Sequence, residues 1–228
     1  MEDESKVKYL LEEVAKIKIG KVVTSKKRFA RDGIPYITEE ALKELSMEDD
    51  TSHLPKVDST LKEQFSFSLV PAQSIVLNKM NLKETYIYQC KTDVCISHDI
   101  IAIIPNESIL IGDYLFHFIK WYQNNNERCN VYSLMIDLPS IAIQHKVVQL
   151  LNAVEQLLKN KGSLITAVKE LPKHFDNISR QAKQHSDSLH QGFEQLNYLY
   201  TAMLDHIFNG DFLNDLQQYH IFQRLCSK

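Results

Sequence analysis

The stretch DLPSIAIQHKVVQLLNAVEQLLKNKGSLITAVKELP (137–172) separates two kinds of sequence in this chain of 228 residues. Within it, apolar side chains recur at alternating spacings of three and four residues over almost four heptads, with Lys161 as the polar exception. A period of 3.5 residues held for this length is typical of a coiled-coil helix, whose apolar seam needs a partner. The predicted dimer or partner interface consists of Val147, Leu150, Val154, Leu157, Leu164, Val168 and Leu171.

The same spacing continues beyond Pro172, with fewer apolar residues, as far as His206. Because a proline inside a helix removes a hydrogen bond and clashes with the preceding turn, we predict two helices, 142–171 and 173–209. The sequence leaves open whether they form a hairpin or a kinked rod. Lys161 also has two interpretations: it sets the register of the pairing, or it lies in water where the helix bends near Gly162. The predicted spacer or dimerisation helices occupy 141–212, and a C-terminal tail occupies 213–228.

Before residue 140 the chain has the pattern of a mixed α+β domain. Short runs of β-branched and aromatic residues alternate with polar turns, which is typical of strands. The predicted strands or extended segments are 17–23, 34–37, 65–70, 74–77, 85–88, 100–104 and 131–139. The segment 108–123 has apolar residues at three-to-four spacing and predicts a helix. The predicted fold is therefore an α+β domain, 1–140, followed by long coiled-coil-like helices.

Composition excludes several classes of protein. No apolar run approaches the ~20 residues of a membrane span, and the start, MEDESKVKY, does not resemble a signal peptide, so a cytoplasmic protein is expected. Four cysteines are too few for a disulfide framework, which predicts reduced thiols. The six glycines stand apart and form neither GxGxxG nor GxxxxGK[ST]. We therefore expect no nucleotide-driven enzyme, and no cofactor is assigned.

Charge is segregated in the first fifty residues. Residues 16–31 hold seven basic side chains and no acid, whereas residues 32–50 hold seven acids and one lysine. A basic segment suits DNA phosphates, and arginine can also read guanine edges; the alternative is a solvated basic loop. A second candidate is the polar segment after residue 77, whose amides and amines suit adenine and phosphate. The predicted DNA-contacting residues are Lys21, Lys26, Lys27, Arg28, Arg31, Asn78, Lys79, Asn81 and Lys83.

Cys90, Cys95 and His98 form the pattern C-x4-C-x2-H, which could begin a zinc site. No fourth ligand stands at a usual spacing, and Cys95 belongs to an apolar run that reads as a strand. We therefore expect buried, reduced cysteines at these positions and assign no metal.

Several segments together resemble one half of the specificity subunit of type I restriction–modification systems. The start of a target-recognition domain in that family is similar to LEEVAKIKIGKVVTSKKRFARDGIPYIT (11–38), where one strand leads through a variable polar loop into a "G-I-P-Y-I" strand. The end of such a domain resembles DIIAIIPN (99–106) with GDYLFHFIKWYQ (112–123). Its exit resembles LPSIAIQHKVVQLLNAVEQLL (138–158), and the end of its helical region resembles YTAMLDHIFNGDF (200–212).

This resemblance implies a non-catalytic reader of double-stranded DNA that docks a methyltransferase subunit, which a restriction subunit can join. The methyl donor and ATP would be bound by those partners. Members of the family carry two recognition domains and two spacer helices in about twice this length, so the resemblance implies a half-subunit that pairs with a second copy or with another half. The segment LNKMNLKETYIYQ (77–89) departs from the family because it lacks a glycine-containing turn.

A different class of function is also compatible with the sequence. In that interpretation the chain is a coiled-coil adaptor or scaffold, and its α+β domain binds a protein rather than DNA. A metal-dependent nucleic-acid enzyme that uses Cys90, Cys95 and His98 is a third interpretation. DNA binding in the presence of a methyltransferase separates the first two, and metal analysis tests the third.

Overall fold

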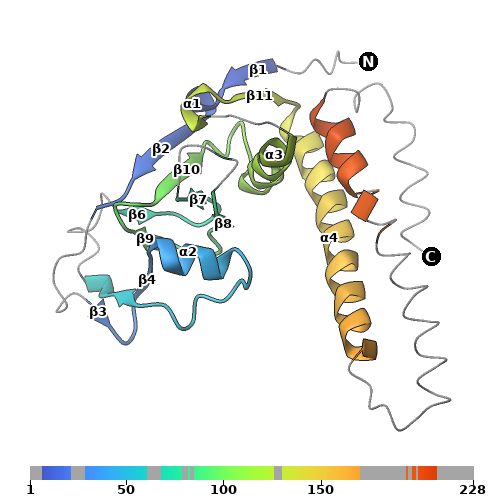
Figure 1. The fold of residues 1–228 in the computed structure, drawn as a ribbon. Helices are drawn as coiled ribbons and strands as arrows, with labels where there is room; N and C mark the ends of the chain where they lie inside the picture. The colour runs from blue at the N-terminus through green and yellow to red at the C-terminus, as the bar shows by residue number, and fades with distance from the viewer. Residues whose placement is uncertain are drawn as a thin grey trace, which may run out of the picture. The chain divides into compact units, whose positions relative to one another are not determined.

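The computed structural model describes residues 7–21, 29–60, 68–78, 82, 85–125, 130–169, 194, 197, 198 and 200–209. It divides into two compact units, 1–145 and 146–228. In its described residues the first unit is a mixed α+β structure whose strands form three sheets. Figure 1 shows this mixture of strands and helices, which confirms the predicted fold class. None of the helices in the described part of the chain is long and apolar enough to cross a membrane.

A two-stranded ribbon joins the beginning of the first unit to its end. Strand β1 (Val7–Leu10) pairs antiparallel with β11 (Met135–Leu138), with Val7 opposite Leu138. Between them the chain makes the single-turn helix α1 (Leu11–Val14) and, much later, the 3-10 turn η4 (Val131–Ser133). The Leu11 N–H donates to the Leu134 carbonyl at 2.8 Å, so the two turns are also connected.

The second sheet has four antiparallel strands in the order β2–β10–β7–β8. Its central strand β10 carries the continuous apolar run, and Ile101, Ala102 and Ile103 are buried, as expected for a strand covered on both faces. The strands are β2 (Ala15–Ile19), β10 (Ile101–Pro105), β7 (Ile75–Leu77) and β8 (Ile87–Gln89).

The third sheet has five short strands in the order β3–β5–β4–β9–β6. Its one parallel pair joins β4 to β9, with Ile37 opposite Ile96. The strands are β3 (Phe29–Ala30), β5 (Lys56–Val57), β4 (Ile34–Ile37), β9 (Val94–Ile96) and β6 (Leu69–Val70).

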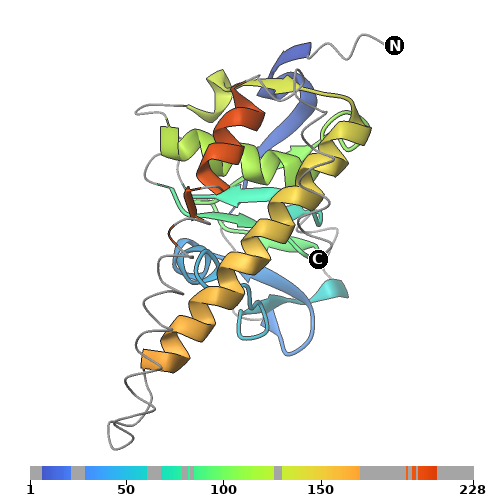
Figure 2. The same ribbon diagram turned by 90° about the vertical axis from the view of Figure 1, so that its right-hand side faces the viewer.

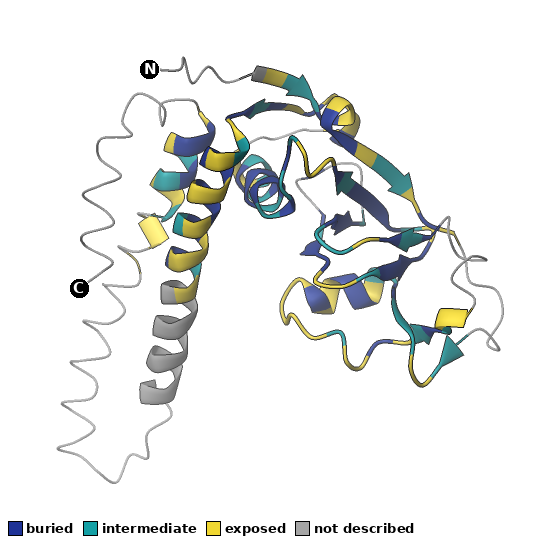
Figure 3. Ribbon diagram, turned by 180° about the vertical axis from the view of Figure 1, so that it is seen from behind, coloured by how far each residue is buried: buried dark blue, intermediate teal, exposed yellow. Residues whose placement is uncertain are grey.

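One hydrophobic core connects helix α2 (Glu39–Leu45) to strands of both larger sheets. Leu42 and Leu45 of α2 belong to the same buried cluster as Val76 of β7 and Ile96 of β9. Figure 3 shows buried residues on α2 and along the strands. The second long helix of this unit, α3 (Gly112–Asn125), buries a face that includes Leu115 and Ile119. Removing such side chains from water supplies the main favourable term in folding this unit.

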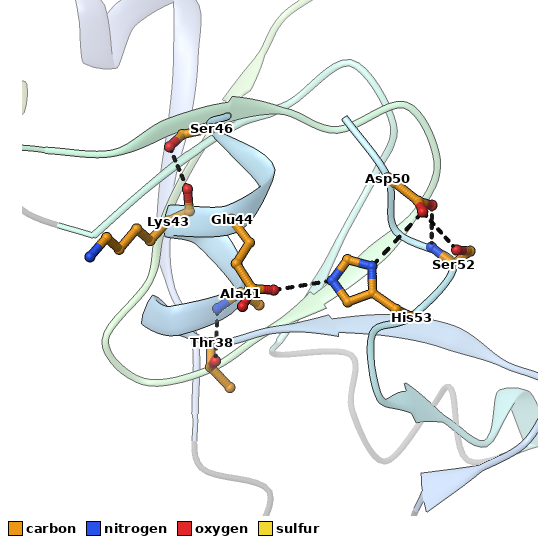
Figure 4. Close-up of polar contacts among 8 residues, drawn as sticks. All are labelled: Thr38, Ala41, Lys43, Glu44, Ser46, Asp50, Ser52 and His53. Atoms are coloured by element: carbon orange, nitrogen blue, oxygen red, sulfur yellow. Dashed lines mark hydrogen bonds and ion pairs between the residues drawn. The ribbon is translucent and has the colours of Figure 1, made fainter. Parts of the chain in front are cut away.

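Helix α2 is fixed at both ends by side chains (Figure 4). Thr38 accepts a hydrogen bond from the Ala41 N–H at 3.3 Å and caps the first turn. At the other end, His53 Nε2 lies 3.1 Å from a carboxylate oxygen of Glu44, and His53 Nδ1 lies 4.0 Å from Asp50. Hydrogen bonds from Ser52 in turn hold Asp50 and lower its pKa. The helix is thus tied to the turn that follows it.

Helix α4 (Ile141–Lys169) is one uninterrupted helix (Figure 2). Gly162 lies within it. The helix confirms the first predicted helix, 142–171, to within two residues at each end. Residues 200–208 are also helical, and the hydroxyl of Tyr200 donates to a carboxylate oxygen of Glu155 in α4 at 2.7 Å. The remainder of the predicted second helix, around residues 173–193, and the tail 213–228 lie outside the described residues.

Several expectations from the sequence need correction. The strand predicted at 17–23 ends at Ile19 in β2, and the segment predicted as extended at 131–139 begins with the 3-10 turn η4. Residues 11–14 form a helical turn rather than the start of a strand, because Glu13 caps the turn by accepting from the Leu10 N–H at 2.6 Å. The predicted helix 108–123 begins only at Gly112, since the N–H groups of Ile109 and Leu110 bond back to the Asn106 carbonyl and form a turn. Helix α2 corresponds to no predicted element.

Candidate nucleic-acid interface

The basic segment 16–31 is described at both of its ends, and an exposed basic residue lies at each. Lys21 follows β2 and is exposed, while its main-chain N–H donates to Ser68 Oγ at 3.0 Å. Arg31 is also exposed and lies in the turn between β3 and β4. The segment between them, 22–28, lies outside the described residues and contains Lys26, Lys27 and Arg28. Both described ends therefore present a charged side chain to solvent.

Two glycines hold these ends against the five-stranded sheet. A Cβ atom on Gly20 would stand 2.2 Å from the Ser97 carbonyl oxygen, and one on Gly33 would stand 2.1 Å from the Val57 carbonyl oxygen. Since no side chain fits at either position, the main chain packs directly on the ends of β9 and β5. Both glycines belong to the segment 11–38, where Gly33 begins the "G-I-P-Y-I" strand, and in this structure they serve close packing.

Lys18 is used within the protein. Its Nζ donates to the Leu69 carbonyl at 2.7 Å and connects β2 to β6. Partial burial, together with the neighbouring Lys16 ammonium, lowers the pKa of Lys18. Among the described basic residues of the segment, Lys16, Lys21 and Arg31 are exposed and Lys18 is partly buried.

The second predicted contact region lies between β7 and β8. Asn78 is partly buried, and its side chain bonds to Glu39, Thr85 and Tyr86 of the same unit. Lys79, Asn81 and Lys83 lie outside the described residues, whereas Leu82 between them is described and buried. The structure therefore places one residue of this predicted group, Asn78, in a network inside the protein.

The predicted buried cysteines are confirmed. Cys90 and Cys95 have no exposed surface, and burial raises the pKa of Cys90 to about 12. His98 is exposed instead, with its Nδ1 atom 2.6 Å from a carboxylate oxygen of Asp99. Within the described ranges, no group of three or more His, Cys, Asp or Glu side chains is arranged to hold a metal ion.

The predicted helical interface is only partly described. Val147 and Val154 are buried and Leu150 is partly buried. Helix α4 contains Leu157, Leu164 and Val168, whose side chains lie outside the described set, as does the whole of Leu171. Near Val154, burial and the Glu155 carboxylate raise the pKa of Tyr200 far above its ordinary value. The interface itself remains a prediction over its whole length.

The sequence patterns assign no role to the residues that hold these regions in place. Gln144 is completely buried and bonds to the main chain at Ile109, Ile111 and Pro139. Glu39 stands out in the sequence only as one acid of an acidic segment. Gln123, the last residue of the segment 112–123, donates to the Thr85 carbonyl at 2.9 Å. No spacing rule joins residues this far apart in the chain.

One open hollow of about 440 Å³ lies at the start of β2. Its lining includes Glu12, Glu13, Lys16, Asn106 and Tyr132, which bring charges of both signs. None of the predicted DNA-contacting residues that the structure describes lines it.

Comparison with solved structures returns chains of type I restriction–modification systems. A chain from a structure of the complex assembly and conformational transition of such a system is 16% identical, with a TM-score of 0.47 over 91% of this chain and 46% of that one. The HsdS subunit from Thermoanaerobacter tengcongensis is 14% identical, with a TM-score of 0.47 over 92% of this chain and 46% of that one. The type I S subunit from M. genitalium is 13% identical, with a TM-score of 0.44 over 75% and 44%.

This chain thus spans less than half the length of these solved chains. They come from the family that the sequence motifs resemble. No family profile and no curated protein matches the sequence.

Proposed function

We propose that this chain is the DNA-recognition subunit of a type I restriction–modification complex in the cytoplasm. The observation that carries the proposal is the acid-free segment 16–31, whose described ends present Lys21 and Arg31 to solvent from a rigidly packed α+β unit. Lysine and arginine on fixed main chain neutralise phosphates and orient a domain on the duplex. Residues 22–28, with three further basic side chains, would contribute to the same surface.

In this proposal the chain carries out no catalytic step. The first unit reads DNA, and α4 with the helix at 200–208 provides the surface on which a methyltransferase subunit docks and to which a restriction subunit can be added. Two copies, or this chain and another half, pair through the seam of α4. Pairing about a two-fold axis places two recognition units on two inverted half-sites.

The test is selection from a randomised double-stranded DNA library by the full chain assembled with its methyltransferase subunit. We expect enrichment of one sequence, arranged as two inverted half-sites if two copies pair. If the assembly forms but selects no sequence, the DNA-reading proposal fails. Capture of a defined protein by the first unit, with no DNA preference, would favour the adaptor interpretation.

A further inference from the structure

Strand β2 lies at one edge of the four-stranded sheet. Its inner neighbour is β10 (Figure 1), and among the described strands none pairs with its other side. At the two ends of this pair, the Gly20 N–H donates to the Ile100 carbonyl at 3.1 Å, and the Asn106 N–H donates to the Val14 carbonyl at 2.8 Å. The even-numbered residues of this stretch therefore direct their main-chain groups towards β10.

The odd-numbered residues of β2 direct their main-chain groups outwards. In an antiparallel pair, residues that exchange hydrogen bonds with the facing strand alternate with residues that do not. Ile17 and Ile19 are of the second kind, so their N–H and carbonyl groups point away from β10. Pro105 stands opposite Ala15 in the same phase, where a residue without an N–H breaks no bond of the pair. The outer edge of β2 is thus a row of main-chain donors and acceptors.

The side chains along this edge are accessible. Ile19 is 49% exposed, and Ile17 is partly buried. Both lie on the same face of the strand, about 7 Å apart, because side chains alternate and each residue advances the strand by about 3.4 Å. Outward main-chain groups beside an accessible apolar face are the features that strand addition by another polypeptide uses.

The open hollow of about 440 Å³ lies at the start of the same edge. It touches the four consecutive residues 14–17, and since neighbouring strand residues point to opposite faces, a space that touches all of them reaches the main chain. Its walls include Glu12 of α1 and Tyr132 of η4, which is 43% exposed. The bond from the Leu11 N–H to the Leu134 carbonyl ties α1 to the end of η4, so the hollow is preformed.

The lining of the hollow suits an arginine side chain. Two carboxylates, of Glu12 and Glu13, face one ammonium group, of Lys16, so the charged side chains sum to a negative charge. Tyr132 adds an aromatic ring, and Ile17 adds an aliphatic side chain. A guanidinium pairs with carboxylates and stacks on aromatic rings, while its stem packs on apolar surface.

The same charges disfavour two other occupants. DNA phosphates would meet the carboxylates of Glu12 and Glu13, and like charges repel. A second copy that paired its own β2 with this edge would bring two sets of Lys16 and Lys18 onto neighbouring strands, which is also unfavourable. Charge complementarity therefore favours a different polypeptide with a cationic side chain.

We infer that the outer edge of β2 is a docking site for an extended segment of a partner polypeptide that carries an arginine. The main chain of this segment extends the sheet by pairing with Ile17 and Ile19, and its guanidinium enters the hollow beside Glu12 and Tyr132. The inference goes beyond the proposed function, because it assigns a polypeptide partner to the first unit and uses none of the residues expected to contact DNA.

The probe is a displayed library of random peptides of about eight residues, which is long enough to span the five residues of β2. It is selected on the full chain without DNA. We expect the enriched peptides to carry an arginine among β-branched residues, and the best of them is synthesised for measurement of its Kd. Methylating alternate main-chain nitrogens on its pairing edge should abolish binding, because these nitrogens then donate no hydrogen bond.

A variant of β2 tests the pairing from the other side. Ile19→Pro removes one outward N–H and keeps the bonds to β10, because proline is tolerated on an edge strand where its nitrogen faces away from the sheet. It should weaken peptide binding by about fivefold or more. Ile19→Val, the matched control, keeps the N–H and a β-branched side chain, and should bind within about twofold of wild type. If Ile19→Pro does not fold, the methylated peptide decides.

The hollow is tested by exchanging charges. Glu12→Lys should weaken binding of the selected peptide by about fivefold and strengthen binding of its arginine-to-glutamate version by a similar factor. Glu13 is left unchanged, because it accepts from the Leu10 N–H and caps α1. The matched control is Glu40→Lys, at an exposed position of α2, which should leave both affinities unchanged.

Three results would overturn the inference. One is a selection that enriches no peptide, or only peptides without arginine. Another is binding that survives both Ile19→Pro and methylation of the peptide, since such a complex does not use the edge. The third is a wild-type dimer that Ile19→Pro dissociates, which would assign the edge to a second copy. A chain that binds the arginine peptide but selects no DNA sequence would refute the proposed function alone.

Discussion

Gln144, in the first turn of α4, accepts a hydrogen bond from the main-chain N–H of Ile111 through Oε1 at 3.0 Å. Its Nε2 donates to the carbonyls of Ile109 and Pro139 at 2.8 Å and 3.0 Å. One buried side chain therefore fixes the start of α4 to the turn that precedes α3. Gln144 belongs to the segment 138–158, which resembles the exit of a recognition domain, and all three of these bonds go to main-chain atoms.

Replacing Gln144 with Leu should lower the free energy of unfolding by roughly 3 kcal/mol, because one N–H and two carbonyls lose their buried partner. Urea denaturation of the full chain measures this change. The control is His145→Leu at the neighbouring exposed position, which should change stability by less than about 0.5 kcal/mol. Equal effects in the two variants would show that the buried bonds do not stabilise the unit.

The Cys90 thiol predicts a specific dependence of stability on pH. Burial raises its pKa from 9.0 to about 12, so the unfolded chain loses this proton before the folded chain does. The contribution of Cys90 is complete below pH 9 and declines as the pH rises towards 12. Above pH 9, the stability advantage of wild type over Cys90→Ala should shrink by about 1.4 kcal/mol per pH unit. An advantage that stays constant between about pH 8 and pH 10.5 would contradict burial of the thiol.

Exposed basic residues predict the salt dependence of DNA binding. If Lys21 and Arg31 each contact a phosphate, changing both to Ala should make the slope of log affinity against log salt shallower by about two. The matched control is Lys43→Ala, which removes an exposed lysine from α2. A slope that does not differ between the double variant and this control would show that the basic ends do not contact phosphates.

The apolar seam predicts an assembly. Changing Leu157 and Leu164 to Asp places two charges in the proposed helix interface and should dissociate it, because desolvated carboxylates without partners are strongly unfavourable. Light scattering measures the mass. Gln149→Asp with Gln156→Asp, both at exposed positions of α4, should leave it unchanged. A wild-type chain that is monomeric both alone and with its methyltransferase would refute pairing.

Patterns of local spacing predicted much of this fold. The strand 34–37 coincides with β4, and the run around Ile101 is the buried centre of a sheet, because alternation and continuous apolarity reflect the environment of a strand directly. The heptads before Pro172 likewise predicted α4. Helix α2 was not predicted, because its acidic residues were interpreted as charge segregation. The signal that could have predicted it is the buried face formed by Ala41, Leu42 and Leu45.

The contact between Glu39 and Asn78 could not be predicted from the sequence, for a physical reason. Glu39 and Asn78 are separated by 39 residues, and their contact depends on how α2 packs against two sheets. Asn78 has the right chemistry for adenine, and only its partners in the folded unit show that its amide is already used. Lys18 is similar, since its pairing with the Leu69 carbonyl follows from strand order rather than from charge.

The pairing of β1 with β11 places the two ends of the first unit beside each other. Everything between Val7 and Leu138 is enclosed by one ribbon of main-chain hydrogen bonds, which depend little on side-chain identity. A stretch of chain with adjacent ends tolerates circular permutation and transplantation into another chain better than one with distant ends. Exchange of this whole interval by recombination would therefore replace its loops in a single event. The crossover points would lie at the two strands of the ribbon, which stay structurally equivalent.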